Sequence, residues 1–433
     1  MKSLAGVLLM LLGNIIFFPV HVSAVQNISI IYSGNLNGEL EPCGCTKEGD
    51  MGGIRRQLTM LERLRKQNPD LFLLSSGGML AIDMATDRIK SQFILQGMRS
   101  LNYDAIGIQS RDLAYGVKFL GGETLPWVSS NHPANVFVPS HQITHGKVTM
   151  QFFSWLTQDS KQLQMMHGKA LNKKPQLQGL GRDIKQAKQS GRLTVLSTSL
   201  RLDKAKDLLP LDDVDILLIE SAHEVFGRPQ QIKHTLVLQP GSRGMRLGHV
   251  ELAFNSKRDI TSFTHKVIDL PTAIPEAPSL AAWYENYNAA LKQDYLKRVE
   301  LRKASERGES PYVGADKCQA CHQAAYKTWQ QSRHAHAFES LAKVNKTFDP
   351  NCIGCHTVAY EKSGGFIDEQ ITEHLMNVQC ESCHGASRVH ASQPASIATQ
   401  HKGWPMDKMC GQCHIGNHSP SFELKQYWPK LAH

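Results

Sequence analysis

Cys318-Gln319-Ala320-Cys321-His322 is the first of four stretches that decide the architecture of the C-terminal third of the chain. Each has the form C-x-x-C-H, and the other three are Cys352-Ile353-Gly354-Cys355-His356, Cys380-Glu381-Ser382-Cys383-His384 and Cys410-Gly411-Gln412-Cys413-His414. This is the attachment sequence of c-type haem. Two thiols one turn apart form thioethers with one haem, and the adjacent His binds the iron as proximal ligand. The sequence therefore predicts four covalently attached c-type haems, held by eight cysteines and four histidines.

Zinc ribbons and disulfides also use paired cysteines, but neither requires a histidine after each pair. Here all four pairs are followed by His, and Cys43 and Cys45 are the only cysteines outside the motifs. With four haems among residues 311–433, the porphyrins themselves are expected to form the core of this region.

Other histidines after residue 310 are candidates for the second axial position on the iron. A His on both faces gives a closed low-spin iron that only passes electrons, whereas an open face can bind and reduce a small molecule. The candidates are His334, His336, His374, His390, His401, His418 and His433.

The composition is that of a globular protein: 433 residues, 41% apolar and 20% charged. It excludes a disordered chain and a polytopic membrane protein, and the length predicts two or three domains. The net charge of +9 alone would fit an anionic partner. Residues 311–433 hold 11 basic and 10 acidic residues, however, and haem propionates would make this part acidic. We therefore expect no nucleic-acid partner.

Residues 1–24 have the pattern of a secretory signal peptide, with an apolar run over residues 4–20 and Val22-Ser23-Ala24 before the cleavage point. The alternative is an uncleaved membrane anchor, because the run approaches spanning length. Asn14 and Pro19 interrupt the run and favour cleavage. We expect a mature chain without a transmembrane anchor, soluble in the periplasm or at the outer surface, where thiols are oxidised or occupied.

Between residues 25 and 272, short apolar runs alternate with helical periodicity, which predicts an α/β layered domain. The segment 235–254, with Pro240-Gly241 in its middle, predicts a hairpin. Residues 273–310 follow a proline-rich boundary and repeat apolar side chains at helical spacing, which predicts a linker helix with one aromatic face packed on a neighbour. A mostly α, haem-packed tetrahaem domain is expected over residues 311–433. The expected strands are 27–32, 71–74, 104–108, 193–196 and 214–219.

Several stretches around the four motifs are distinctive: Tyr312-Val313-Gly314, Trp329, Ser332-Arg333-His334-Ala335-His336-Ala337, Gly364-Gly365-Phe366 and Val378-Gln379-Cys380-Glu381-Ser382-Cys383-His384-Gly385. In these residues the C-terminal domain resembles the tetrahaem cytochrome c-554 family. The resemblance implies that His334 is a distal ligand and that His390 is another. For the fourth motif, His418 and His433 both match. One haem of the family's prototype has no distal ligand, and the resemblance leaves open whether that holds here.

The N-terminal domain carries, in order, Ser33-Gly34-Asn35-Leu36-Asn37-Gly38, Gly52-Gly53-Ile54-Arg55-Arg56, Leu73-Leu74-Ser75-Ser76-Gly77-Gly78 and Tyr103-Asp104-Ala105-Ile106-Gly107. This order resembles the catalytic half of secreted 5′-nucleotidases in the metallophosphoesterase superfamily, whose substrate domain is not matched. Such enzymes hold two metal ions with Asp and His, which activate the attacking water.

The metal ligands of that family are largely replaced in this sequence, so the resemblance implies a retained fold without hydrolysis. The replacements are Asn35-x-Asn37 for D-x-H, Gly78 for the G-D Asp, Gln109-Ser110-Arg111 for N-H-E, Leu196-Ser197-Thr198 for L-S-H, and Ser221-Ala222-His223-Glu224 for G-H-x-H.

Cys43-Gly44-Cys45 lies in the loop where the lost ligands would open the active site. One interpretation is a structural disulfide or a buried pair. The other is a redox-active dithiol or a thiolate metal site. A C-x-C disulfide closes a small, strained ring, and strain makes it easier to reduce. Cys43 and Cys45 are therefore a candidate redox pair.

These observations predict an exported multihaem c-type cytochrome that transfers electrons in a periplasmic or cell-surface respiratory chain. Its partners would be other redox proteins, either cytochromes or a quinol-linked donor. The alternative is an oxidoreductase that acts on a small nitrogen or sulfur compound at an open haem or at Cys43 and Cys45. A metal-dependent nucleotide phosphohydrolase is the third candidate, and the lost ligands speak against it.

Overall fold

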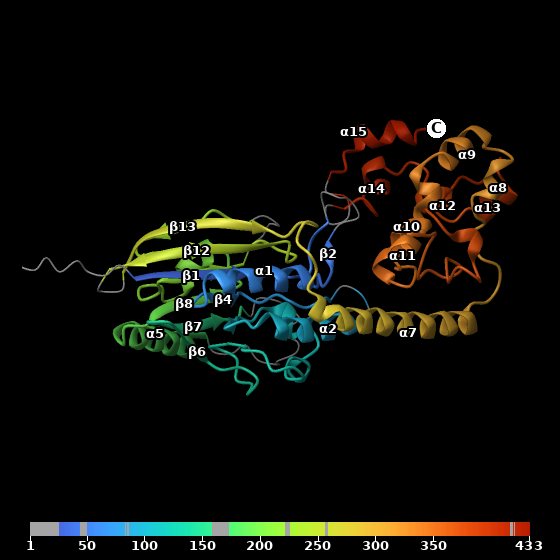
Figure 1. The fold of residues 1–433 in the computed structure, drawn as a ribbon. Helices are drawn as coiled ribbons and strands as arrows, with labels where there is room; N and C mark the ends of the chain where they lie inside the picture. The colour runs from blue at the N-terminus through green and yellow to red at the C-terminus, as the bar shows by residue number, and fades with distance from the viewer. Residues whose placement is uncertain are drawn as a thin grey trace, which may run out of the picture.

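The structure, a computed structural model, describes residues 26–43, 50–82, 84, 86–157, 173–220, 226–255, 259–415, 419 and 421–433. The predicted signal peptide (1–24), Cys45 and His418 lie outside this part of the chain. Figure 1 shows an N-terminal layered domain and a C-terminal domain of short helices, with the long helix α7 (Ala281–Ser305) running from one to the other.

Two mixed β-sheets form the centre of the N-terminal domain. Their strand orders are β13-β12-β1-β4-β5 and β10-β11-β9-β8-β7-β6, and β2 (Pro42–Cys43) pairs separately with β3 (Met51–Gly52). The strands of the first sheet are β1 (Gln26–Ser33), β4 (Phe72–Ser75), β5 (Ala105–Ile106), β12 (Arg246–Phe254) and β13 (Ile260–Asp269). Those of the second are β6 (Ser140–His145), β7 (Val148–Trp155), β8 (Leu193–Thr198), β9 (Ile216–Ile219), β10 (Gln230–Ile232) and β11 (Thr235–Leu238).

The sheets pack face to face, and helices cover their outer faces. Alternate side chains of a strand point to opposite sides, so β1 directs Ile30 and Tyr32 into the core between the sheets and Ile31 toward the helices. The fold is therefore an α/β structure of four layers, as the sequence predicted. The helices of this domain are α1 (Ile54–Gln67), α2 (Asp87–Leu101), α3 (Val117–Leu120), α5 (Lys173–Gln189) and α6 (Leu202–Leu208).

The hairpin expected over residues 235–254 is wrong. β11 runs parallel to β9 in the second sheet, whereas β12 pairs antiparallel with β1 and β13 in the first. The loop at Pro240-Gly241 crosses between the sheets, and the Arg243 N–H donates to the Asn35 carbonyl at 2.7 Å. A Pro-Gly turn signal is the same for a crossing as for a hairpin.

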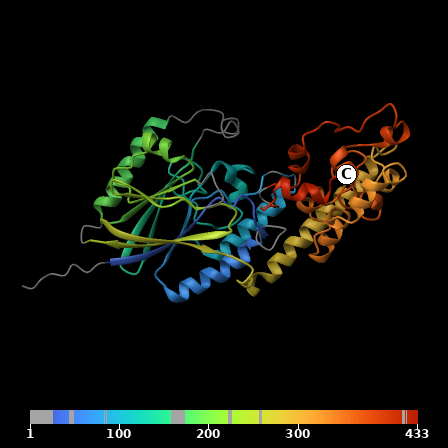
Figure 2. The same cartoon turned by 90° about the horizontal axis from the view of Figure 1, so that it is seen from above.

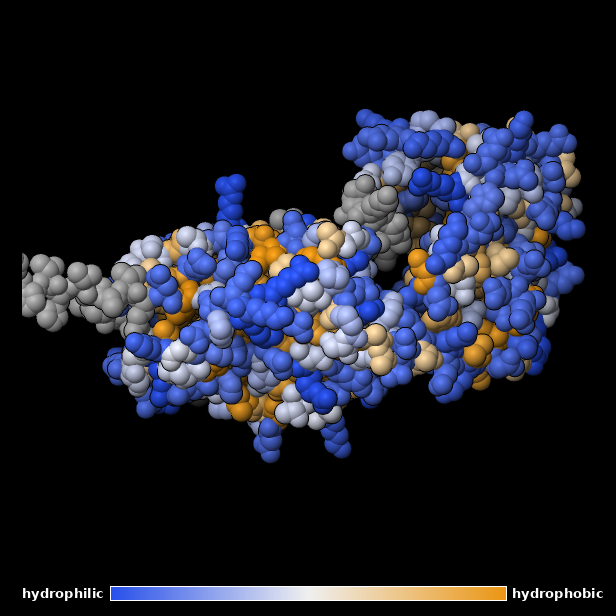
Figure 3. Space-filling view, viewed as in Figure 1, coloured by the Kyte–Doolittle hydropathy of each residue, from blue (hydrophilic) through white to orange (hydrophobic). Residues whose placement is uncertain are grey.

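Helix α7 belongs to the cores of both domains. Its buried side chains Tyr287, Leu291, Tyr295 and Val299 lie in one continuous apolar cluster, which also contains residues from α1 and α2 and from the haem-motif domain. Trp283 Nε1 donates to the Phe93 carbonyl at 3.1 Å on the N-terminal side. Figure 2 shows α7 passing from the N-terminal domain under the C-terminal one, and on the face drawn in Figure 3 the surface is hollowed where the two domains meet.

The C-terminal domain has short helices linked by loops, as the sequence predicted, and its apolar side chains Phe338, Phe366 and Leu375 join the cluster around α7. Within the described ranges, no helix is long and apolar enough to cross a membrane. The helices are α8 (Asp316–Gln319), α9 (Gln323–Gln330), α10 (Ala337–Lys343), α11 (Pro350–His356), α12 (Cys380–His384), α13 (Arg388–Ser392), α14 (Met406–Cys410) and α15 (Leu424–Tyr427).

Candidate haem-binding site

Each C-x-x-C-H motif forms a helical turn. The second motif ends α11 and the third forms α12. In the first and fourth, the backbone N–H of His322 donates to the Cys318 carbonyl and that of His414 to the Cys410 carbonyl, both at 2.9 Å. A helical turn places residues three apart on one side. All eight motif cysteines are free thiols, in the arrangement that two thioether bonds to one haem edge require.

Three of the four motif histidines face a histidine from elsewhere in the chain. Ring centroids are 6.2 Å apart for His322 and His390, 6.0 Å for His384 and His433, and 6.0 Å for His414 and His334. A metal–imidazole bond is about 2 Å long and the ring centre lies about 1 Å further, so two rings on opposite sides of one metal ion have centroids roughly 6 Å apart. The side chains therefore fit haem iron held between two imidazoles.

Hydrogen bonds at Nδ1 orient three of these rings and the ring of His356. The Nδ1 atom of His390 lies 2.6 Å from the carbonyl oxygen of Ile397, and that of His433 lies 2.9 Å from the carbonyl oxygen of Leu431. The Nδ1 atom of His414 lies 3.0 Å from Ser419 Oγ, and that of His356 lies 2.6 Å from the carbonyl oxygen of Ala337. A ring that donates through Nδ1 keeps Nε2 free for a metal ion.

The second motif differs from the other three. Among the described residues, no other histidine ring faces His356, and His418 lies outside them. The remaining candidate rings, His336, His374 and His401, do not pair with a motif histidine in this part of the chain. His401 instead stacks on Trp404 at 3.8 Å and bonds the Cys383 carbonyl through Nδ1, and His336 lies 3.3 Å from Glu339.

The motifs lie in contact with one another. Cys318 lies beside Cys380, Cys355 lies beside Cys413, and Cys383 lies near Cys410. The motifs therefore follow the spatial order first, third, fourth, second.

Two buried polar side chains tie the third motif to the start of the domain. Glu381, only 3% exposed, accepts from the N–H groups of Val313, Gly314 and Ser387, each at 2.9 Å. Gln379 accepts from the Ala315 N–H at 2.6 Å. Backbone N–H groups that would otherwise be buried without partners are satisfied in this way, and the first and third motifs are held together.

At the positions where the resemblance implies metal ligands, the N-terminal domain has a network of hydrogen bonds. Gln109 Nε2 donates to Asn35 Oδ1 at 2.8 Å. An added Cβ at Gly78, where the family has Asp, would lie 2.6 Å from Gln109 Oε1. Asp112 accepts from the Gly78 and Met79 N–H groups. Within the described residues, no cluster of three or more His, Cys, Asp or Glu could hold a metal ion.

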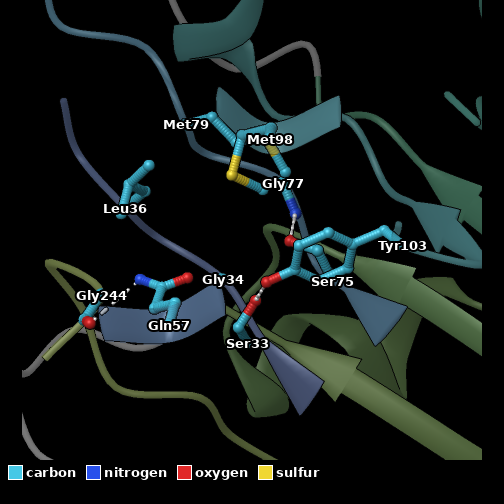
Figure 4. Close-up of a pocket in the computed structure, with 10 residues that line it drawn as sticks. All are labelled: Ser33, Gly34, Leu36, Gln57, Ser75, Gly77, Met79, Met98, Tyr103 and Gly244. Atoms are coloured by element: carbon cyan, nitrogen blue, oxygen red, sulfur yellow. Dashed lines mark hydrogen bonds between the residues drawn. The ribbon is translucent and has the colours of Figure 1, made fainter. Parts of the chain in front are cut away.

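A small pocket beside this network, drawn in Figure 4, has the wrong lining for phosphoester chemistry. Its walls include Leu36, Met79 and Met98, and the Ser33 and Tyr103 hydroxyls bond each other at 2.7 Å. No carboxylate or imidazole lines it. Metal-dependent hydrolysis needs such ligands, and the described lining of this pocket supplies none. Residues 221–225, and with them His223, lie outside the described residues, as does Cys45. Cys43 contributes its backbone to β2, where it pairs with Met51.

Paired imidazoles beside C-x-x-C-H turns are typical of c-type cytochromes. Residues 317–385 match the family described as cytochrome c554 and c-prime. Cytochrome c-554 of Nitrosomonas europaea is 36% identical over 95 residues, which cover 18% of this chain and 40% of that protein. The match thus spans about two-fifths of the length of this relative. The expected resemblance of the C-terminal domain is confirmed, and it supports a multihaem cytochrome with covalently bound c-type haems.

The N-terminal domain has the fold of 5′-nucleotidases. The 5′-nucleotidase precursor of Thermus thermophilus superposes with a TM-score of 0.52 and 16% identity, over 67% of this chain and 63% of that chain. The sulfate thiohydrolase SoxB of the same species, solved with glycerol, gives 0.51 and 14%, over 62% and 61%. At these identities the likeness concerns the fold alone, and it confirms the metallophosphoesterase-like architecture.

Proposed function

We propose that the protein is an exported cytochrome with four covalently attached c-type haems, which transfers electrons between redox proteins in a periplasmic or cell-surface respiratory chain. The pairing of three motif histidines with His390, His433 and His334 carries this proposal. Haem iron with two imidazole ligands exchanges single electrons and has no free position for a substrate.

The residues have distinct roles in this proposal. The eight motif cysteines hold the cofactors, and His322, His356, His384 and His414 are the proximal ligands. His390, His433 and His334 are the distal ligands of the first, third and fourth motifs. The contacts between cysteines of different motifs keep neighbouring attachment sites close together. Short distances between haems favour electron transfer from one haem to the next.

The mass of the purified protein tests the proposal. It should exceed that of the mature polypeptide by four haems, and acid–acetone should extract none of them. N-terminal sequencing should begin near Val25 if residues 1–24 are removed on export. A holoprotein with fewer haems, or with extractable haem, would contradict the cofactor assignment.

The second candidate function is that of an oxidoreductase for a small nitrogen or sulfur compound. The observation that favours it is that no described histidine ring faces His356. An iron held by His356 alone would have an open position. Carbon monoxide should then bind one haem of the reduced protein. An entirely low-spin protein that ignores carbon monoxide would exclude this candidate at the haem.

A dithiol reaction at Cys43 and Cys45 is the other form of this candidate. Oxidation of the two thiols to a disulfide would release two protons and two electrons, and the electrons would reduce two ferric haems. Haem reduction by thiol and sulfur donors should then slow in a Cys43→Ser, Cys45→Ser double variant. Unchanged rates with every donor would exclude the reaction.

The third candidate function, a nucleotide phosphohydrolase, has its own test. Metal-dependent release of phosphate from nucleotides at ordinary enzyme rates would favour it over the electron-transfer proposal.

A further inference from the structure

The two domains meet at a group of polar residues, the junction cluster, made of Glu41, Tyr284, Asn288, Lys346 and Asp349, of which Lys346 and Asp349 are buried. Lys346 is its centre and is only 8% exposed. Its Nζ lies 2.6 Å from Glu41 Oε1, 2.7 Å from Asn288 Oδ1 and 3.8 Å from Asp349 Oδ2. A buried ammonium group is costly unless it is paired and hydrogen-bonded, and these three oxygens supply partners for Lys346.

The cluster has the character of an interior charge pair. Tyr284 donates its hydroxyl to Glu41, and Lys346 Nζ lies 5.4 Å from the ring centroid of the fully buried Tyr287. Burial works against the charged form of Lys346, but Glu41 and Asp349 outweigh it and raise its pKa. The charged form of Lys346 is thus favoured at a buried position, where solvent screens its charge little.

Each side of the cluster leads directly to a cysteine segment. On the N-terminal side, Glu41 immediately precedes β2, which contains Cys43. On the C-terminal side, Asp349 caps α11 by accepting from the Asn351 N–H at 3.0 Å, and its carbonyl accepts from the Cys352 N–H at 2.9 Å. The same helix ends at His356.

We propose that the Lys346–Glu41 pair is a positioning device through which the N-terminal domain fixes the second haem motif and sets the reduction potential of its haem. The proposal rests on the proposed function as a multihaem cytochrome. Lys346 and Glu41 act through α11 and through their charges rather than by touching the iron. The N-terminal domain thereby acts on one haem of the set, the one whose proximal ligand no described histidine faces.

The charges give opposite expectations for the two partners. Replacing Lys346 with Met removes a positive charge and leaves Glu41 with the Tyr284 hydroxyl as its partner, which disfavours the reduced haem. Replacing Glu41 with Gln keeps the shape, removes a negative charge and leaves Lys346 with Asp349 as its acidic partner, which favours the reduced haem. Because the pair is buried, each change should alter the ratio of reduced to oxidised haem about tenfold at fixed potential, about 59 mV for a one-electron couple.

The experiment is a potentiometric titration of the full-length holoprotein, followed by optical and electron paramagnetic resonance spectra. Lys346→Met should lower the midpoint potential of one haem, and Glu41→Gln should raise it. Lys346→Arg keeps the positive charge and should leave that potential as in the wild type. Arg246→Met is the control, because it breaks the Arg246–Asp269 pair on the N-terminal sheet without touching α11. If Lys346→Met fails to fold, the Glu41→Gln and Lys346→Arg variants decide the question.

Equal shifts of all haems, shifts of the same sign in Lys346→Met and Glu41→Gln, or unchanged potentials would each overturn the inference. So would an equal effect of Arg246→Met. The mass of the wild-type protein distinguishes failure of this inference from failure of the proposed function. A chain without covalent haem refutes the proposed function. A haem-loaded chain whose potentials do not change in the variants refutes only the role of the Lys346–Glu41 pair.

Discussion

The rings of His334 and His414 face each other with centroids 6.0 Å apart, although His334 follows the first motif and His414 ends the fourth. Burial and the nearby His414 and His356 lower the pKa of His334, which favours the neutral form of the ring that a metal ion requires. The proposed distal ligand of the fourth motif thus comes from the segment that contains Ser332 and His336.

We expect the His334→Ala variant to convert one low-spin haem to the high-spin state and to add one carbon-monoxide-binding site. His336→Ala is the matched control, since His336 lies in the same short helix but is exposed and faces Glu339. Electron paramagnetic resonance and carbon monoxide titration measure both variants. An unaltered low-spin signal in His334→Ala, or an equal change in the control, would contradict the assignment.

Leu291 and Leu296 of α7 provide a test of the shared core. Leu291 is 1% exposed and lies in the apolar cluster, whereas Leu296 is 51% exposed. Leu291→Ala should lower the free energy of unfolding by about 2–5 kcal/mol, because it leaves a cavity. Leu296→Ala should cost about 0.5 kcal/mol or less.

Urea unfolding followed by circular dichroism and by haem absorbance measures both effects. The two signals should shift together in Leu291→Ala, because one core serves both domains. Separate transitions, with the haem signal unmoved, would argue against a continuous core.

The Gly78→Ala variant tests how closely the side chain of Gln109 packs against Gly78. Its φ of +78° is strained for any side chain, and an added Cβ would also collide with Gln109. Gly191 has a similar φ of +72° but open space around it. Gly191→Ala should therefore cost about 1 kcal/mol for backbone strain alone, and Gly78→Ala clearly more. Equal losses in thermal unfolding would mean that Gln109 moves aside without cost.

His249 should make the N-terminal sheets sensitive to acid. Burial, assisted by Lys266 and His265 and opposed by Glu251, lowers its pKa. A base with a lowered pKa in the fold stabilises the protein above its unfolded pKa of about 6.5, and this stability is lost as the pH falls below it. Ser29 Oγ lies 2.7 Å from Nε2, a bond that Gln can replace.

The urea midpoint of the wild type should therefore fall more between pH 8 and pH 5 than that of His249→Gln. His234→Gln, in an exposed turn, is the control and should keep the wild-type dependence. Parallel curves for wild type and His249→Gln would locate the acid sensitivity elsewhere.

Local signals in the sequence were sufficient for strands β1, β4, β5, β8 and β9, for helix α7 and for recognising the C-x-x-C-H motifs, because each depends on neighbours in the chain. Strands β6, β7, β10 and β13 were not predicted. His334, His390 and His433 were recognisable as candidates, but the motif that each one faces depends on how distant loops fold together. The Glu41–Lys346 pair was missed for the same reason: a lone Glu before Pro42 and a lone Lys before α11 carry no pattern. The hairpin prediction at Pro240-Gly241 was wrong because a Pro-Gly turn does not determine which sheet the next strand joins.

Helix α7 contributes to both cores, and this has a consequence for how the protein is made. Until the segment after Pro311 has packed against α7, Tyr295 and Val299 lack the apolar partners that the C-terminal domain contributes to their cluster. A chain whose C-terminal domain has not folded should therefore expose an apolar strip of this helix. Folding of the C-terminal domain and burial of α7 are thereby coupled.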